Sequence, residues 1–211
     1  MSNLYKAFYS KFYTKTKKEG SVCASPDCIV GDIFRLDFEV TDGSTTAVIF
    51  NKFDRYIGYF DEQITQELLL LRADGKKIDL LLSFVAYRDT PGPALYWGEF
   101  AVISYNSVYS QEFNSVVSSL SLELARGKRP SLNLEKKEID LIIENCSGFT
   151  FKNFTKREKL EPGSAFVKTK ISTSEKLVES GRKGKLGCWV ATFLFFLIIV
   201  FVIVYLVQKF L

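Results

Sequence analysis

The chain has 211 residues, of which 28 are Lys or Arg and 24 are Asp or Glu, so its formal net charge is +4. It contains no histidine, which excludes Ser-His-Asp and Cys-His nucleophile systems. Neither the Gly-x-x-x-x-Gly-Lys nor the Gly-x-Gly-x-x-Gly phosphate-binding pattern occurs. We therefore expect a protein that is not an enzyme, with no catalytic residue and no cofactor. A hydrolase with a pair of carboxylates stays open as an alternative, because distant Asp and Glu side chains can converge in a fold, but none of the acidic residues stands out as such a pair.

The charge is distributed unevenly along the chain. Residues 1–22 carry five Lys and one Glu, which predicts a basic N-terminal arm. Residues 23–105 carry seven basic and thirteen acidic residues, whereas residues 106–187 carry fifteen basic and ten acidic residues. An acidic middle segment is thus flanked by two basic ones.

The first predicted element is a strand over residues 32–40. Phe34, Leu36, Phe38 and Val40 alternate with polar or charged residues, which is typical of a half-buried strand. Asp42-Gly43 supplies turn chemistry, and the β-branched run Thr-Thr-Ala-Val-Ile-Phe follows, so the two runs predict a hairpin. A further strand near residues 22–30 is a weaker expectation.

A helix and two more strands are expected next. Asp61 is a suitable N-cap for a helix that runs to about Ala73, and Asp74-Gly75 ends it. Lys-Ile-Asp-Leu-Leu-Leu-Ser-Phe-Val-Ala-Tyr and Leu-Tyr-Trp-Gly-Glu-Phe-Ala-Val-Ile-Ser-Tyr then predict two strands joined by Thr-Pro-Gly-Pro. This order indicates a mainly β or α+β fold: a small barrel with one or two helices, or a small sandwich.

After residue 106 the pattern becomes helical. Phe113, Val116, Val117, Leu120 and Leu124 repeat at helical spacing until Gly127, and residues 135–151 form a second apolar cluster whose secondary structure stays open. We interpret residues 23–150 as one globular domain with a flanking helix. Residues 151–187 are rich in Lys, Ser, Thr, Glu and Gly, which predicts a basic flexible stalk.

The C-terminal segment is strongly apolar. Residues 189–207 contain no charged residue, and as a helix they span about 28 Å, so residues 188–208 predict a transmembrane helix. Arg182, Lys183 and Lys185 precede this segment and only Lys209 follows it, which predicts a cytosolic N-terminal body. The expected protein is tail-anchored and single-pass in the endoplasmic reticulum or another organelle membrane, with the lipid bilayer as a partner.

Three residues qualify this topology. Cys188 lies beside the basic residues, where it is either an acylation site or a plain boundary cysteine. Asn145 and Asn153 begin patterns for N-glycosylation, and use of either one would invert the topology.

Residues 30–105 resemble a known family. Phe-Arg-Leu-Asp-Phe-Glu-Val-Thr-Asp-Gly-Ser-Thr-Thr-Ala-Val-Ile-Phe, a helix, and then Gly-Lys-Lys-Ile-Asp-Leu resemble the C-terminal OB-fold domain of the large subunit of replication protein A and its plant-type relatives. The family has a zinc ribbon with two Cys pairs before this hairpin. Here Cys23 and Cys28 have no second pair after them, so we expect no zinc.

The resemblance implies that the domain binds single-stranded nucleic acid by aromatic stacking and cationic side chains. The positions that would do so are Arg35, Lys52, Phe53, Arg55, Tyr56, Tyr87, Arg88, Tyr96 and Trp97. Strand aromatics also serve as core residues or cross-strand pairs. The acidic middle segment favours an alternative, in which the protein is an adaptor whose small acidic β domain binds a basic protein partner.

Overall fold

A computed structural model describes residues 4–90, 92–145, 148–157, 159–182, 193–200, 205 and 207–208. The chain divides into two compact units, Met1–Ile171 and Ser172–Leu211. The first unit contains all the strands that the structure describes.

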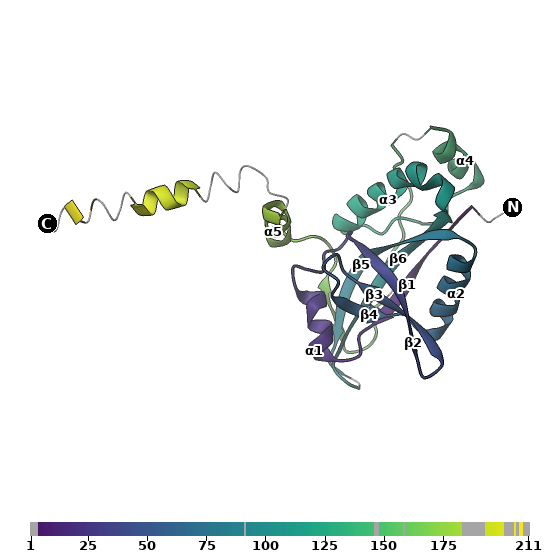
Figure 1. Cartoon of the computed structure of the whole chain (residues 1–211), viewed down its shortest axis with the longest axis horizontal. Coiled ribbons are helices and arrows are strands. Elements are labelled where there is room, and N and C mark those ends of the chain that lie inside the picture. The colour runs from purple at the N-terminus through teal and green to yellow at the C-terminus, as the bar shows by residue number, and fades with distance from the viewer. Residues whose placement is uncertain are drawn as a thin grey trace. The chain divides into compact units, whose positions relative to one another are not determined.

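Six strands of the first unit close into a ring (Figure 1). They are β1 (Tyr5–Tyr13), β2 (Ile33–Thr41), β3 (Ser44–Phe50), β4 (Tyr56–Tyr59), β5 (Lys76–Arg88) and β6 (Leu95–Asn106). Neighbours are antiparallel in the order β2-β3-β4-β1-β6-β5, and β2 pairs with β5 to close the ring. The unit is therefore a small antiparallel β domain whose strand pairing is compatible with an OB-like barrel.

Local sequence signals account for the hairpin and the first long helix. β2 and β3 pair from Arg35↔Phe50 to Thr41↔Ser44, and Asp42 and Gly43 turn the chain with φ angles of 52° and 77°. Helix α2 (Glu62–Ala73) begins where the Asp61 carboxylate accepts a hydrogen bond from the Ile64 N–H at 2.9 Å. The predicted hairpin and helix are both confirmed.

Residues that the sequence indicated as part of a basic arm form β1. This strand lies between β4 and β6, and its pairing with β6 extends from Tyr5↔Tyr105 to Tyr13↔Trp97. Phe12, near the C-terminal end of this strand, lies in the core at 0% exposure, whereas Lys6, near its N-terminal end, is exposed and pairs with Glu67 at 2.7 Å. The density of basic residues alone did not distinguish a basic arm from a strand of the barrel.

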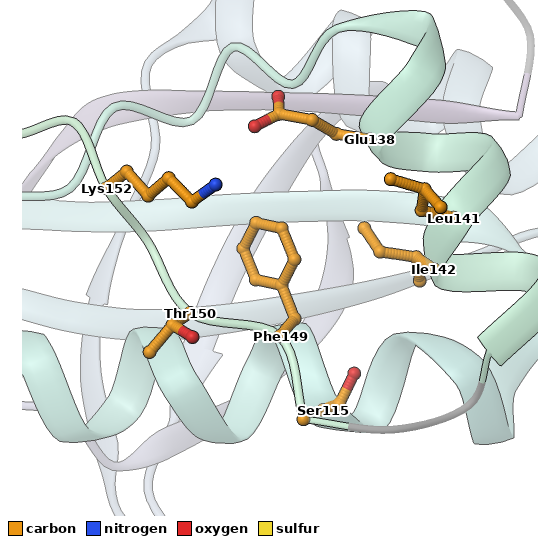
Figure 2. A pocket seen from close by; sticks show the side chains of 8 residues that line it. Ser115, Glu138, Leu141, Ile142, Phe149, Thr150 and Lys152 are labelled. Carbon is orange, nitrogen blue, oxygen red and sulfur yellow. The ribbon is translucent and has the colours of Figure 1, made fainter.

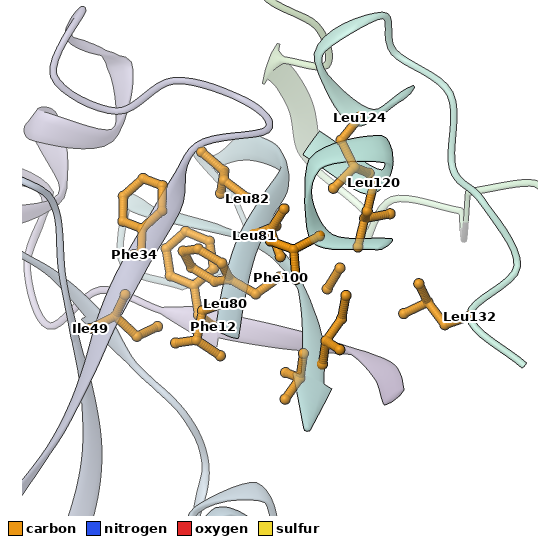
Figure 3. Packing of buried hydrophobic residues seen from close by; sticks show 14 of the residues in the cluster. Phe12, Phe34, Ile49, Leu80, Leu81, Leu82, Phe100, Leu120, Leu124 and Leu132 are labelled. Carbon is orange, nitrogen blue, oxygen red and sulfur yellow. The ribbon is translucent and has the colours of Figure 1, made fainter. Parts of the chain in front are cut away.

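The barrel interior is aromatic and aliphatic. Figure 3 shows Phe12, Phe34, Ile49, Leu80, Leu82 and Phe100 gathered inside. Phe100 is central, with its ring centroid 4.9 Å from that of Phe12 and 5.1 Å from that of Phe34. A side chain at Gly98 would meet the Phe84 carbonyl and the Phe12 ring, so glycine allows this close packing.

Helix α3 (Ser110–Ala125) covers the outer face of β5 and β6. Phe113, Leu120 and Leu124 are buried there at 0% exposure, and Leu81, on the outer side of β5, lies towards them (Figure 3). Because β5 and β6 are covered on both faces, they read as continuous apolar runs in the sequence. The second apolar cluster, whose type the sequence left open, contains helix α4 (Lys136–Asn145).

We call residues 148–171, described except for residue 158, the strap. Strand β7 (Ser164–Lys168) of the strap pairs with β5. Leu160 packs on a small outer cluster of Phe84, Ala86 and Trp97. Lys168 Nζ also donates hydrogen bonds to the Ser25 and Cys28 carbonyls at 2.6 and 2.8 Å. Residues 151–171, predicted as part of a flexible stalk, therefore belong to the barrel unit.

Residues 17–24 are helical: α1 (Lys17–Gly20) leads into a 3-10 helix (Ser21–Ala24). The further strand predicted near residues 22–30 is therefore not found there. Cys23 and Cys28 are free thiols at 0% exposure. In the described part of the chain no three His, Cys, Asp or Glu side chains gather in a way that could hold a metal ion.

Among the described residues of the second unit, no helix corresponds to the predicted membrane helix. Helix α5 (Thr173–Arg182) has ten residues, several of them charged, which is too short and too polar to cross a bilayer. No helix among the described residues has the length and apolar character to span a membrane. The predicted span at 188–208, the single-pass topology and the organelle-membrane localisation are therefore wrong. Arg182 ends α5, whereas Lys183, Lys185 and Cys188 lie outside the described residues.

Candidate nucleic-acid interface

Each predicted cation on the β2–β3–β4 side has an acidic partner. Arg35 contacts Asp37 at 2.9 Å and Asp54 at 3.0 Å. Lys52 pairs with Asp32 at 3.2 Å, and Arg55 pairs with Asp27 at 2.8 Å. These side chains are arranged as ion pairs, and they do not form a continuous positive groove.

The predicted aromatic residues lie at separate places. Tyr56 packs edge-to-face against Phe50 at 6.0 Å, and Phe53 is 44% exposed on the β3–β4 turn. Tyr87 and Tyr96 form a cross-strand pair at 5.0 Å, with Lys17 Nζ above Tyr87.

The two remaining predicted residues are held by the strap. Trp97 is 3% exposed, and its Nε1 donates a hydrogen bond to Ser164 Oγ at 3.1 Å. Arg88 contacts Glu161 at 3.2 Å. Trp97 is thus part of the packing under the strap, and its ring faces are not available for stacking.

A different group of cations surrounds a cavity of about 480 Å³, which we call the basic cleft. Its walls come from the turn after α3 and from the strap: Gly127, Lys128, Arg129, Phe154, Thr155, Lys156, Arg157, Lys159, Leu160 and Phe166. The volume falls in the roughly 300–1,000 Å³ range of sites for small ligands. Five of the ten lining residues are Lys or Arg, and two are Phe.

Backbone pairing fixes the two walls of the cleft. Gly127, with a φ of 86°, turns the chain after α3. Residues 129–131 then run antiparallel to 153–155, with the Ser131 N–H donating to Asn153 O and the Thr155 N–H donating to Arg129 O, both at 2.8 Å. The basic side chains of both segments are brought together by this pairing.

Arg129 is the structural cation of the cleft. Its guanidinium donates to Glu99 through Nε at 3.0 Å and Nη2 at 2.9 Å, and Nη1 donates to Thr155 Oγ1 at 2.8 Å. It also lies 3.7 Å from the centroid of the Tyr9 ring. Its charge is therefore compensated within the protein.

Arg157 is held differently. Its Nη2 donates two hydrogen bonds, to the Gly127 carbonyl at 3.0 Å and to the Thr169 carbonyl at 2.8 Å. Its Nε is buried without a hydrogen-bond acceptor in the described structure. Burial lowers the pKa of Arg157, Glu99 partly offsets this effect, and the Arg129 guanidinium lowers the pKa further. An anion in the cleft would relieve both the desolvation and the repulsion between the two guanidinium groups.

The remaining cations and aromatics face solvent. Lys156 and Lys159 are exposed and form no ion pair with any residue in the described ranges. Lys128 Nζ lies 5.0 Å above the Phe154 ring and 3.2 Å from Glu123. Phe154 and Phe166 are 45% and 44% exposed. The cleft thus combines unpaired cations with accessible ring surface.

A second cavity of about 320 Å³ has another character (Figure 2). It lies by α3 and α4, where Glu138, Lys152 and Phe149 face it. The Glu138 carboxylate accepts a hydrogen bond from the Glu135 N–H at 2.8 Å, as expected at a helix start. One carboxylate and one ammonium group balance each other here, so this cavity does not favour a polyanion.

No family and no curated relative is found. No protein-family model matches the chain. No curated protein matches its sequence. The resemblance to replication protein A therefore has no support from a family or a homologue.

Two short basic runs in the sequence correspond to the two walls of the cleft, although the sequence alone did not show that they lie together. Ala-Arg-Gly-Lys-Arg-Pro at 125–130 and Phe-Thr-Lys-Arg-Glu-Lys at 154–159 are both dense in basic residues, and the second run begins with Phe154. The second run was interpreted as stalk because it lacks an apolar period. Its partner across the cleft lies about 26 residues away in sequence, as in the contact of Arg129 with Thr155.

Proposed function

We propose that the barrel unit binds single-stranded nucleic acid through the basic cleft, without catalysing a reaction. The single observation that carries this proposal is that Lys156, Lys159 and the partly buried Arg157 line the same cleft as the exposed rings of Phe154 and Phe166. Proteins that bind single strands combine cations along the backbone with aromatic platforms for the bases. The cleft has both features.

The arrangement of strands supports the same class of function. The meander β2-β3-β4, then α2, then β5 and β6, follows the order of an OB-fold, with β1 added between β4 and β6. This order is what the resemblance to the replication protein A domain implies. The proposed site differs from the one expected by resemblance, because the cations of the β2–β3–β4 side are paired with Asp residues.

The test is fluorescence anisotropy with the full-length chain and a labelled oligothymidylate or oligouridylate of about 12 nucleotides, which lies within the range of OB-fold site sizes. We expect binding that weakens steeply as salt rises from about 50 to 200 mM, because phosphate contacts release counterions. Replacing Lys156 and Lys159 with Glu should weaken the binding by more than about tenfold and reduce the salt slope by about two.

The matched control is the double variant Lys136→Glu, Lys137→Glu on α4. Both residues are exposed, and the change in net charge is the same. We expect this variant to bind nearly as the unmodified chain does. Absence of binding at low salt, or an equal loss in the two double variants, would reject the cleft as a nucleic-acid site.

A further inference from the structure

A third pocket, of about 270 Å³, lies on the β2–β3–β4 side of the barrel and is lined by Lys15, Glu19, Glu39, Phe50 and Tyr56. We call it the aromatic pocket. Three strands and the segment after β1 contribute to it: Glu39 comes from β2, Phe50 from β3 and Tyr56 from β4. Its chemistry is opposite to that of the basic cleft.

The rings of this pocket already attract cations of the protein itself. The Arg35 guanidinium lies 4.5 Å from the Phe50 ring centroid, and Lys15 Nζ lies 5.4 Å from that of Tyr56. A cation held above an aromatic face is stabilised by the negative charge of the ring face. The edge-to-face contact between Phe50 and Tyr56, at 76°, fixes the two rings.

The carboxylates of the pocket are not neutralised. Neither Glu19 nor Glu39 forms an ion pair with a residue that the structure describes, in contrast to the Asp residues nearby. Burial raises the pKa of Tyr56, and the charges of Glu19 and Glu39 raise it further, so both carboxylates act on this ring. An added cation would be attracted by both groups.

The Tyr56 hydroxyl is a further unsatisfied group. Its oxygen is buried and has no hydrogen-bond partner among the described residues. Buried polar atoms are nearly always hydrogen-bonded, so an orphan atom beside a pocket calls for an external partner. A guanidinium or ammonium group can donate to this oxygen while lying between the rings and the carboxylates.

We propose that the aromatic pocket binds a cationic side chain, Arg or a methylated Lys, presented by a basic segment of a partner protein. Charge complementarity selects this occupant, since the two unpaired carboxylates outnumber the single Lys15 ammonium group at the pocket and two of its walls are aromatic. Phosphate is disfavoured there for the same reason. The inference is independent of the proposed function, because the two sites share no residue.

The test is an NMR titration of the full-length chain, labelled at Phe and Tyr. The probes are three short Gly/Ser peptides with a central Arg, dimethyl-Lys (which keeps one N–H donor) or norleucine. We expect saturable shifts of the Phe50 and Tyr56 ring signals with the Arg or dimethyl-Lys peptide and none with norleucine. Replacing Glu19 and Glu39 with Gln should weaken this binding by about tenfold, since two attractive charges are lost.

The control variant is Asp140→Asn with Glu144→Gln, which removes two exposed charges from α4. It should bind the peptides as the unmodified chain does. Equal shifts with the norleucine peptide, no saturable shift with either cationic peptide, or unchanged binding in the Glu19/Glu39 variant would each overturn the proposal. None of these outcomes affects the oligonucleotide experiment.

Discussion

Arg129 and Glu99 form a buried ion pair with two hydrogen bonds, at 3.0 Å from Nε and 2.9 Å from Nη2. Their side chains are only 12% and 6% exposed, and Ser83 Oγ donates a third hydrogen bond to Glu99 at 2.8 Å. The pair joins β6 to the turn after α3. This ion pair therefore holds in place the wall of the basic cleft that follows α3.

Replacing Arg129 with Met should destabilise the fold strongly. The change leaves the Glu99 carboxylate buried with Ser83 as its partner, and breaking one side of a buried pair costs about 3–5 kcal/mol. Arg126→Met is the control, because Arg126 is 63% exposed and its pair with Glu123 should contribute about 1 kcal/mol or less. Urea unfolding of the variants measures both effects, and similar losses at the two positions would contradict the assignment.

Stability should fall at alkaline pH through Tyr105. This side chain is fully buried and its Oη donates to Asp79 Oδ2 at 2.6 Å. Burial raises the pKa of Tyr105 above the ordinary value of 10.0, and Asp79 raises it further. Because the folded state keeps the proton that the unfolded chain loses, the resulting stability is present below pH 10 and is lost as the pH rises above it.

The measurement is urea unfolding from neutral pH to above the ordinary tyrosine pKa, with the variants Tyr105→Phe and Tyr205→Phe. Loss of Tyr105 should reduce the alkaline slope by up to about 1.4 kcal/mol per pH unit, although it also lowers stability at every pH by removing a hydrogen bond. Tyr205, 64% exposed, controls for the substitution itself. An unchanged slope in Tyr105→Phe would refute the prediction.

Local signals were the part of the fold that the sequence could predict. The alternation in residues 32–40, the turn at Asp42-Gly43 and the cap at Asp61 each act within a few residues, and each is found in the structure. The apolar runs that form β5 and β6 were also predicted correctly as strands. These features depend on neighbouring residues, so they are visible in a single sequence.

Features that depend on distant partners were missed. β1 contacts β6, which lies about 90 residues later, and β7 reaches β5 from the other direction. Nothing local distinguishes Leu160 and Phe166 of the strap from residues of a linker, because their packing partners Trp97 and Phe84 belong to other strands. The basic cleft was missed for the same reason, whereas the predicted cations proved to be ion-paired.

Removing residues 1–13 should prevent the barrel from closing. β1 is the strand between β4 and β6, so its loss exposes two strand edges and the aromatic core around Phe100. We expect this truncated chain to aggregate on size-exclusion chromatography and to lack a cooperative thermal transition. Removing residues 172–211, which form the separate second unit, should leave the transition of the first unit in place. A folded, monomeric chain without residues 1–13 would show that they are a dispensable arm.

Three phenylalanines with nearly equal exposure allow the two possible nucleic-acid surfaces to be compared directly. Phe154 and Phe166 line the basic cleft at 45% and 44% exposure, and Phe53 lies on the β3–β4 turn at 44%. Replacing Phe154 or Phe166 with Ala should weaken oligonucleotide binding by about 1–3 kcal/mol per stacked base. The salt slope should stay unchanged, because no charge is removed. Phe53→Ala should bind as the unmodified chain does in the same anisotropy titration. The reverse pattern, in which only Phe53→Ala weakens binding, would show that the oligonucleotide binds on the β2–β3–β4 side and that the basic cleft is not part of the interface.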